Sequence, residues 1–187
     1  MSTPSVSPNT AVTIQNLQAA FNGESNAAAK YALFASKAGE EGYARVASLF
    51  RAASRAEQIH AANHARVLEK LGAKPEAKIE TPEVKSTAEN LKCAIAGEEY
   101  ERDVMYPGFI REAKAQNNSA ALRTFQFALE AEAEHASLYT VALNSLEQQR
   151  TATAFYVCVV CGYTTADAEL VRCAICKAPR EKFESII

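Results

Sequence analysis

A Glu-x-x-His pattern that occurs twice constrains this chain more than any other feature. Glu57 and His60 form the first pair, Glu132 and His135 form the second, and together they use two of the 3 histidines in the chain. Residues three positions apart lie on one face of a helix, so each pair can direct a carboxylate and an imidazole toward a common point. Iron, manganese and zinc all accept this ligand set. The pattern therefore predicts helices that meet around metal.

A further glutamate precedes each pair by about the length of one helical hairpin. Glu24 stands 33 positions before Glu57, and Glu98 stands 34 positions before Glu132. The chain thus reads as two similar halves. Di-iron carboxylate four-helix bundles have this arrangement, with one Glu from each of two helices and a Glu-x-x-His from each of the other two. We therefore expect a mainly α protein with a four-helix bundle over residues 10–147.

Helix boundaries are marked along this region. Apolar residues recur at alternating steps of three and four in four stretches, as amphipathic helices require. Gly72 is expected to end the second helix as a C-cap, and two prolines indicate a crossover loop over residues 73–85. Ser86 and Glu89 suit a capping box at the start of the third helix. Pro107 predicts a kink or bulge within it.

Several carboxylates fall on the apolar stripes of the expected helices. They are Glu24, Glu57, Glu98, Glu101 and Glu132. An unpaired buried carboxylate costs several kcal/mol, which a total stability of roughly 5–15 kcal/mol could not absorb five times. The stripes contain no Lys or Arg, so a pair of metal ions is the expected counter-charge. The competing interpretation, that these side chains reach solvent at the stripe edges, suits one glutamate better than a set matched with two histidines.

The last part of the chain carries a second metal-binding pattern. Cys158-x-x-Cys161 is followed by Cys173-x-x-Cys176, and such paired knuckles bring four thiolates to one tetrahedral metal. A segment of about 30 residues is too small to fold on its core alone, so metal should supply the folding free energy. Two disulfides are the alternative, and zinc and iron both suit four sulfurs. We expect a linker over 148–155 and this metal domain over 156–187.

The overall composition is that of an ordinary soluble protein. The 187 residues are 48% hydrophobic with a net charge of −2, which gives no bias toward nucleic acid. No stretch suits a membrane span, and the uncharged residues 1–23 lack the basic start and apolar run of a signal peptide. Residues 1–9 are expected to be a disordered tail. We expect a cytoplasmic protein whose cysteines are reduced or hold metal.

With both patterns in place, nearly the whole chain resembles the rubrerythrin family, which joins a ferritin-like di-iron bundle to a C-terminal rubredoxin-like domain. The resemblance rests on Gly23-Glu24-Ser25, Glu57-x-x-His60, Gly97-Glu98-Glu99-Tyr100-Glu101, Met105-Tyr106-Pro107, Glu132-x-x-His135 and the four cysteines. It implies iron at both sites and a peroxidase that reduces hydrogen peroxide to water. It also implies a homodimer, and electrons that arrive at the tetrathiolate iron from a rubredoxin or an NAD(P)H-dependent reductase.

The resemblance assigns roles to the residues of the bundle. Glu57 and Glu132 match bridging carboxylates, Glu24 and Glu98 match terminal ligands, and His135 matches the fixed histidine ligand. The rubredoxin-type ligands match Cys158, Cys161, Cys173 and Cys176.

Four residues are candidates for a catalytic role. Glu101 matches an extra carboxylate, and in the family one iron moves between the positions matching Glu101 and His60 as its redox state changes. Tyr31 and Tyr106 are expected either to hydrogen-bond ligands or simply to pack in the core. His64 follows His60 on the same stripe and is expected to support the ligands or the core rather than to bind metal.

Two positions in or near the cysteine patterns depart from a regular pair of metal-binding knuckles. Lys177 stands in the second knuckle where the family usually has Gly, at a position that tends to need φ > 0, which costs a non-Gly residue about 1–2 kcal/mol. We therefore expect a strained or slightly reshaped knuckle. Cys93 has no partner at knuckle spacing and is expected to be a small buried hydrophobe.

Two other functions fit the same motifs. The first is iron oxidation and storage, as in ferritins, although a storage shell needs no attached electron carrier. The second is a bundle whose tail is a structural zinc ribbon that docks a partner. Colour would distinguish the metals, because ferric thiolate sites are red and zinc thiolate sites are colourless.

Overall fold

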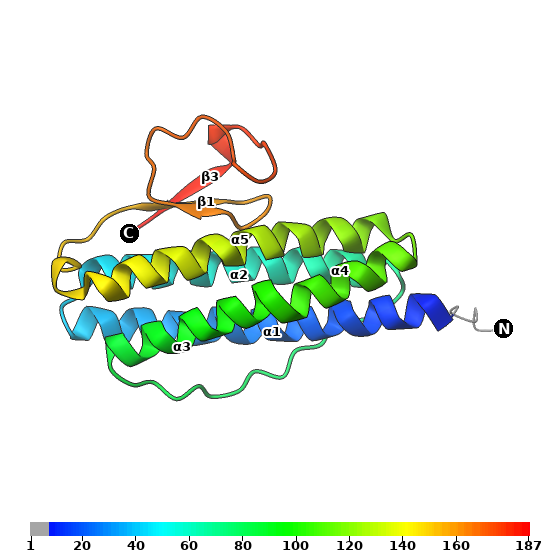
Figure 1. Ribbon diagram of the computed structural model, residues 1–187, viewed down its shortest axis with the longest axis horizontal. Helices are drawn as coiled ribbons and strands as arrows, with labels where there is room; N and C mark the ends of the chain where they lie inside the picture. Colours follow the sequence, from blue (N-terminus) through cyan, green and yellow to red (C-terminus); the bar gives the residue numbers. More distant parts are fainter. Residues whose placement is uncertain (1–7) are drawn as a thin grey trace.

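Long antiparallel helices form the body of the molecule, and a small sheet covers one side of it (Figure 1). The structure is a computed structural model that describes residues 8–187. Its helices are α1 Pro8–Glu40, α2 Ala44–Lys70, α3 Thr87–Tyr100, α4 Tyr106–Ala115 and α5 Ser119–Asn144, with a π-helical segment over Glu101–Met105 and 3-10 turns over Leu146–Gln148 and Arg180–Lys182. Its strands are β1 Phe155–Cys158, β2 Thr164–Thr165 and β3 Phe183–Ile186.

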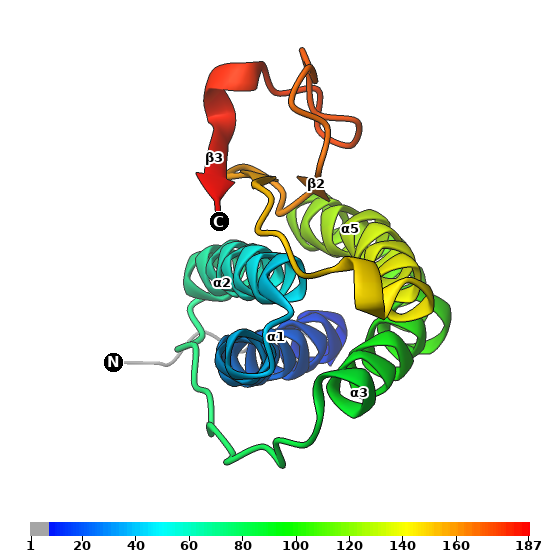
Figure 2. The same ribbon diagram turned by 90° about the vertical axis from the view of Figure 1, so that its left-hand side faces the viewer.

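The bundle consists of two helical hairpins that share one core. Helix α1 packs along α2, while α3 and α4 pack along α5, and the view down the bundle shows these four rods around a common centre (Figure 2). Aromatic rings fill one half of the core, where Tyr31, Phe50 and Tyr139 are all within 6 Å of one another between ring centroids. The expected ferritin-like four-helix bundle is confirmed.

The junction between α3 and α4 is the bulge that Pro107 predicted. Pro107 has no N–H and so cannot donate to the carbonyl four residues earlier. The backbone widens instead into the π-helical segment, in which the N–H of Tyr106 donates to the carbonyl of Glu101, five residues back. The N–H of Glu101 still bonds the carbonyls of Gly97 and Glu98, so regular helical geometry continues from Glu98 to Glu101 and the wider turn displaces the residues that follow.

The helix ends follow the expected local chemistry. Gly72 takes φ 79° after α2, and Ala73 N–H then donates to the Leu68 carbonyl, as in a Schellman C-cap. The capping box of Ser86 and Glu89 is present at the start of α3.

The crossover loop is attached to α1 by asparagine side chains. Asn22 Oδ1 accepts from Lys78 N–H at 2.9 Å, and Asn26 Oδ1 accepts from Glu80 N–H at 2.8 Å. These bonds hold the loop along α1, on the opposite side of the helix from the buried Glu24.

The C-terminal segment forms a three-stranded antiparallel sheet in the order β2-β1-β3. It lies against α2 and α5 (Figure 2). Phe155 and Val157 of β1 are buried in the same apolar cluster as the bundle core. At the edge, Arg55 donates to both carboxylate oxygens of Glu184 at 2.7 and 3.0 Å. The sheet is therefore packed directly on the bundle.

Two expectations differ from the structure. Cys93 is exposed, because it lies just beside the buried stripe of α3 rather than on it. Helix α1 already begins at Pro8, whereas a tail was expected over 1–9; the expectation for residues 1–7 lies outside the described residues. Within the described part of the chain, no helix combines the length and apolar character that a membrane crossing requires.

Candidate metal centres

Six side chains from four helices converge in the middle of the bundle. Helix α1 supplies Glu24, α2 supplies Glu57 and His60, α3 supplies Glu98, and α5 supplies Glu132 and His135. Each is at most 1% exposed. Their ligand atoms form two overlapping groups of four, each within 4.8 Å, and Glu57 and Glu132 belong to both groups. This is the arrangement expected for two metal ions that share two carboxylates.

Unpaired carboxylate oxygens show that these residues fit metal ions. Among the residues described, Glu24 Oε2, Glu57 Oε1, Glu98 Oε2 and Glu132 Oε1 are buried without any hydrogen-bond partner. Buried anionic oxygens left unpaired are strongly destabilising. Ion pairs to these four carboxylates come only from histidines within residues 8–187. Cations at the two groups would satisfy the oxygens and supply the missing charge.

The electrostatics of the metal-free cluster lead to the same conclusion. Burial, together with neighbouring carboxylates, raises the pKa of Glu98 to about 8 and raises the pKa of Glu24 well above its ordinary value. Burial would lower the pKa of both site histidines, but the adjacent carboxylates, Glu132 at His60 and Glu57 at His135, raise it well above the ordinary value. Protons thus take the place of the missing cations in the metal-free protein.

The C-terminal domain orients both site imidazoles. His60 Nε2 lies 3.0 Å from the carbonyl of Cys161, which can only accept, so this nitrogen is the donor. His135 Nε2 lies 3.1 Å from Thr164 Oγ1, whose own proton goes to the Gly162 carbonyl. In the neutral rings both Nδ1 atoms therefore carry the lone pair, and both face the carboxylates. Such outer hydrogen bonds fix the tautomer that a metal needs.

The two candidate tyrosines hydrogen-bond carboxylates of the cluster. Tyr31 donates to Glu98 Oε1 at 2.5 Å, and Tyr106 donates to Glu24 Oε1. Both rings are also buried in the core, so packing and hydrogen bonding coexist. His64 is fully buried, and its Nε2 lies 3.2 Å from the Tyr106 hydroxyl.

Glu101 lies outside the two groups of ligand atoms. It is half-buried at the start of the π-helical segment and lines a cavity of about 250 Å³. Gly23 and Gly97 line the same cavity, and a Cβ at Gly23 would lie 3.9 Å from Glu101 Oε1. Glu101 is thus placed beside the cluster, at an opening toward the crossover loop.

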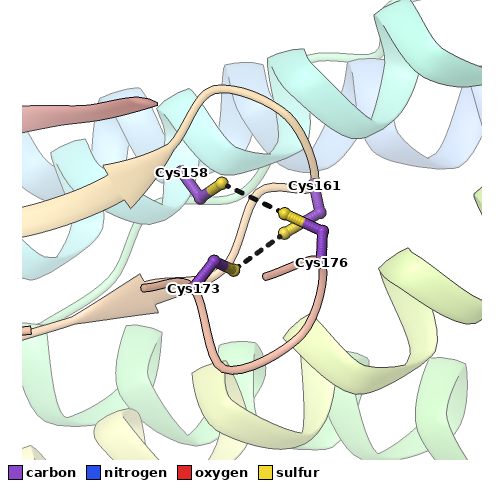
Figure 3. A group of neighbouring side chains, drawn as sticks. All are labelled: Cys158, Cys161, Cys173 and Cys176. Carbon is purple, nitrogen blue, oxygen red and sulfur yellow. Dashed lines mark hydrogen bonds between the residues drawn. The ribbon is translucent and has the colours of Figure 1, made fainter. Parts of the chain in front are cut away.

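The four knuckle cysteines converge as one group (Figure 3). Cys158 Sγ lies 3.6 Å from Cys176 Sγ, and Cys161 Sγ lies 3.4 Å from Cys173 Sγ. A disulfide bond would be about 2.05 Å long. Metal–sulfur bonds of ~2.3 Å in a tetrahedron place sulfurs ~3.8 Å apart, close to the observed spacing. The group therefore fits one tetrathiolate metal and contains no disulfide.

The two knuckles have matching turns. Gly162 N–H donates to the Cys158 carbonyl, and Lys177 N–H donates to the Cys173 carbonyl. Gly162 has φ 82° and Lys177 has φ 62°, so the lysine adopts the left-handed conformation that its position was expected to need. The knuckle keeps its shape despite the non-glycine residue.

Three contributors to the sites carry no sequence signal that we could use. Thr164 reaches His135, Thr124 reaches His64, and Gly162 lies against His60. Each contact depends on where the C-terminal domain or a neighbouring helix lies, and the spacing of the motifs does not encode that position.

Fold and sites together define a class of protein: a ferritin-like bundle with a di-iron carboxylate–histidine site and a rubredoxin-like domain that holds one further iron. Comparison with protein families agrees. The family model described as Rubrerythrin matches residues 15–143, and the family model of the rubrerythrin rubredoxin-like domain matches residues 156–184. The chain belongs to the rubrerythrin family.

Individual relatives show the same relationship over nearly full length. Nigerythrin of Nitratidesulfovibrio vulgaris is 38% identical over 172 residues, which cover 91% of this chain and 85% of the relative. Rubrerythrin-2 of Clostridium acetobutylicum is 36% identical over 179 residues, covering 94% and 97%. The solved structure of fully reduced, all-ferrous nigerythrin superposes with a TM-score of 0.87 at 35% identity, covering 98% of this chain and 89% of that one.

Metal removal is expected to make stability fall as the pH rises from about 5 to 8. The pKa of Glu98 is about 8 in the folded metal-free chain, whereas an ordinary glutamate has a pKa of 4.5. Between these two pH values the folded chain keeps a proton on this carboxyl that the unfolded chain has released. Rising pH therefore favours unfolding, by up to about 1.4 kcal/mol per pH unit for each such group. The raised pKa values of His60 and His135 act in the same direction.

Thermal unfolding of chelator-treated protein across this pH range measures the effect. The metal-loaded protein is the control and should show no such loss, because metal replaces the protons and binds more tightly as the pH rises. Stability of the metal-free protein that rises toward pH 8 would contradict the prediction.

Proposed function

We propose that this protein is a non-haem iron peroxidase that reduces hydrogen peroxide to water with electrons that enter through its rubredoxin-like domain. The observation that carries the proposal is the contact between the two centres. His60, a residue of the carboxylate cluster, hydrogen-bonds the backbone of Cys161, a residue of the thiolate cluster. A protein that only stored iron would not need an electron carrier in contact with its oxidation site.

Iron at the two centres would supply the redox chemistry, namely two electrons for one O–O bond at the carboxylate site and electron transfer at the thiolate site. The side chains prepare this reaction. Glu57 and Glu132 are shared by the two ligand groups, so they can hold both metals at a fixed separation. The hydroxyls of Tyr31 and Tyr106 hold Glu98 and Glu24 in place. Burial of the cluster excludes bulk water from the reacting bond.

Access and electron supply complete the proposal. Hydrogen peroxide is small enough for the cavity that reaches Glu101. His60 belongs to one ligand group and Glu101 lies outside both, and we propose that they serve as alternative ligands in the two redox states. The electron donor is a rubredoxin or an NAD(P)H-dependent reductase. The protein would act as a cytoplasmic homodimer in defence against oxidative stress.

Rapid mixing tests this function. The iron-loaded protein is reduced without oxygen and mixed with hydrogen peroxide or, separately, with dioxygen, while the red colour of the thiolate-bound ferric iron is followed. Fast return of the colour with peroxide and slow return with dioxygen are expected. A protein that stays colourless, or that recovers equally with both oxidants, would point to the zinc-ribbon or iron-oxidation function instead.

Replacing Glu101 with alanine should lower peroxide turnover by at least about tenfold, the lower range seen when support for a catalytic metal is lost. Iron content should stay close to that of the native protein, because Glu101 lies outside both ligand groups. Turnover and bound iron are measured on the same sample. Glu99→Ala is the matched control, since its side chain is 51% exposed on the same helix. Native turnover in Glu101→Ala would refute the role.

A further inference from the structure

A basic groove lies between α2 and α5, on the side of the bundle that faces the first cysteine knuckle. It has a volume of about 580 Å³, and its lining includes Arg66, Lys70, Arg123 and Val160. None of the residues that line it is acidic. Thr124 also lines the groove and is 7% exposed, so this residue lies at the boundary between the groove and the bundle interior.

A chain of hydrogen bonds leads from this groove to the carboxylate cluster. Thr124 Oγ1 lies 3.1 Å from His64 Nδ1. The other ring nitrogen, His64 Nε2, lies 3.2 Å from the hydroxyl of Tyr106. That hydroxyl donates to Glu24 Oε1. The residues come from α5, α2, α4 and α1, so the chain crosses the whole bundle.

The direction of each bond in this chain can be deduced. When Glu24 is ionised, as a carboxylate that holds metal would be, it can only accept, so Tyr106 gives its one proton to Glu24 and must accept from His64 Nε2–H. His64 is fully buried and its two ring nitrogens lie next to neutral hydroxyl groups, which favours the neutral ring. A neutral ring that is protonated on Nε2 has an acceptor at Nδ1, which receives the Thr124 proton. Every hydrogen in the chain therefore points toward Glu24.

We propose that Thr124, His64 and Tyr106 form a path that delivers protons from the basic groove to the carboxylate site. The proposal rests on the proposed function, because reduction of one hydrogen peroxide to two waters takes up two electrons and two protons. A proton from solvent in the groove binds Thr124 Oγ1 as the Thr124 proton moves to His64 Nδ1. The Nε2 proton moves to Tyr106, and the Tyr106 proton moves to Glu24 and on to the reacting oxygen.

No member of the path changes its net charge in this transfer. The imidazole begins and ends neutral, with its proton moved from Nε2 to Nδ1, and a turn of the ring and of the hydroxyls restores the starting direction. The path therefore does not require His64 to become charged inside the bundle, which burial opposes.

Removing one hydroxyl tests the path on the iron-loaded protein. Thr124→Val keeps the shape of the side chain and deletes only the entry hydroxyl. Rapid mixing of the reduced protein with peroxide is performed in H₂O and in D₂O. We expect Thr124→Val to slow the reaction by about tenfold or more, within reach of typical proton-transfer contributions, and to change the solvent isotope effect. Thr140→Val, on the exposed side of the same helix, should match the native protein in reaction rate and in solvent isotope effect.

A second readout does not depend on activity. In protein loaded with zinc, nitrogen NMR should show His64 protonated on Nε2, with an N–H that exchanges with solvent more slowly in Thr124→Val than in the native chain. An Nδ1–H tautomer of His64 would overturn the path. So would a Thr124→Val variant whose reaction rate, solvent isotope effect and His64 N–H exchange all equal those of the native protein. If the native protein does not react with peroxide, the proposed function fails, and the NMR result still decides whether the groove and Glu24 are connected.

Discussion

Gly162→Ala is expected to separate the two metal centres without removing a single ligand. A Cβ at this position would overlap His60 Nε2 and lie only 2.6 Å from His60 Cδ2, and its backbone φ is 82°. Left-handed backbone costs a non-glycine residue about 1–2 kcal/mol, and overpacking costs about 1–3 kcal/mol. Movement of the knuckle relieves the overpacking but not the backbone cost, and the overpacking alone costs as much as or more than a hydrogen bond such as that from His60 to Cys161 contributes, about 1 kcal/mol. The knuckle should therefore move away from His60.

The expected result in Gly162→Ala is slow recovery of the red colour after peroxide, with both centres still loaded. Gly72→Ala is the matched control, because Gly72 has φ 79° but no atom within 4 Å of an added Cβ. It should lose a similar backbone contribution to stability and keep native electron transfer. Equal recovery rates in the two variants would show that the contact at His60 does not matter for the transfer.

Removing the metal from the four cysteines should unfold the C-terminal domain while the bundle stays helical. The sheet has three short strands, and metal binding to structural thiolate sites is worth about 10–16 kcal/mol for zinc. The remaining attachments contribute less: burial of Phe155 and Val157 is worth about 1.5–3 kcal/mol each, and a surface pair such as Arg55 with Glu184 about 0–1 kcal/mol.

Hydrogen exchange of Cys176→Ser, read along the chain, measures this unfolding. Strand amides such as those of Tyr156 and Val157 should lose protection, while helix α1 keeps its own. Cys93→Ser controls for loss of a thiol, because Cys93 is exposed and lies outside the thiolate group. Continued protection of β1 in Cys176→Ser would mean that packing on the bundle, rather than metal, holds the strand.

Much of the bundle could be predicted because helical periodicity and ligand spacing are local. The period of 3.6 residues placed Glu24, Glu57, Glu98 and Glu132 on the same stripes as large apolar residues, and the structure buries all four. The same argument was wrong for Cys93, where a shift of one position around the helix separates a buried from an exposed side chain.

What could not be predicted depends on distant parts of the chain. Neither the spacing of the cysteines nor the helical periodicity indicates that the C-terminal domain reaches His60 and His135 from outside the bundle. Glu101 follows Glu98 by three positions in regular helical geometry, yet that spacing alone does not show that Glu101 lies outside both groups of ligand atoms. Pro107 indicated a local irregularity but not that it would take the form of a π-helical segment.

The hydrogen bonds from the two site imidazoles to the tail have a thermodynamic consequence. The C-terminal domain, here called the tail, fixes the imidazole tautomers that bind metal in the bundle. Metal bound in the bundle in turn fixes the orientation of the imidazoles that hydrogen-bond the tail. Such coupling is reciprocal: whatever factor the docked tail adds to metal affinity in the bundle, bound metal adds to docking of the tail. Because the tail itself needs metal to fold, loading of either centre promotes loading of the other, and partly loaded molecules should be scarce at equilibrium.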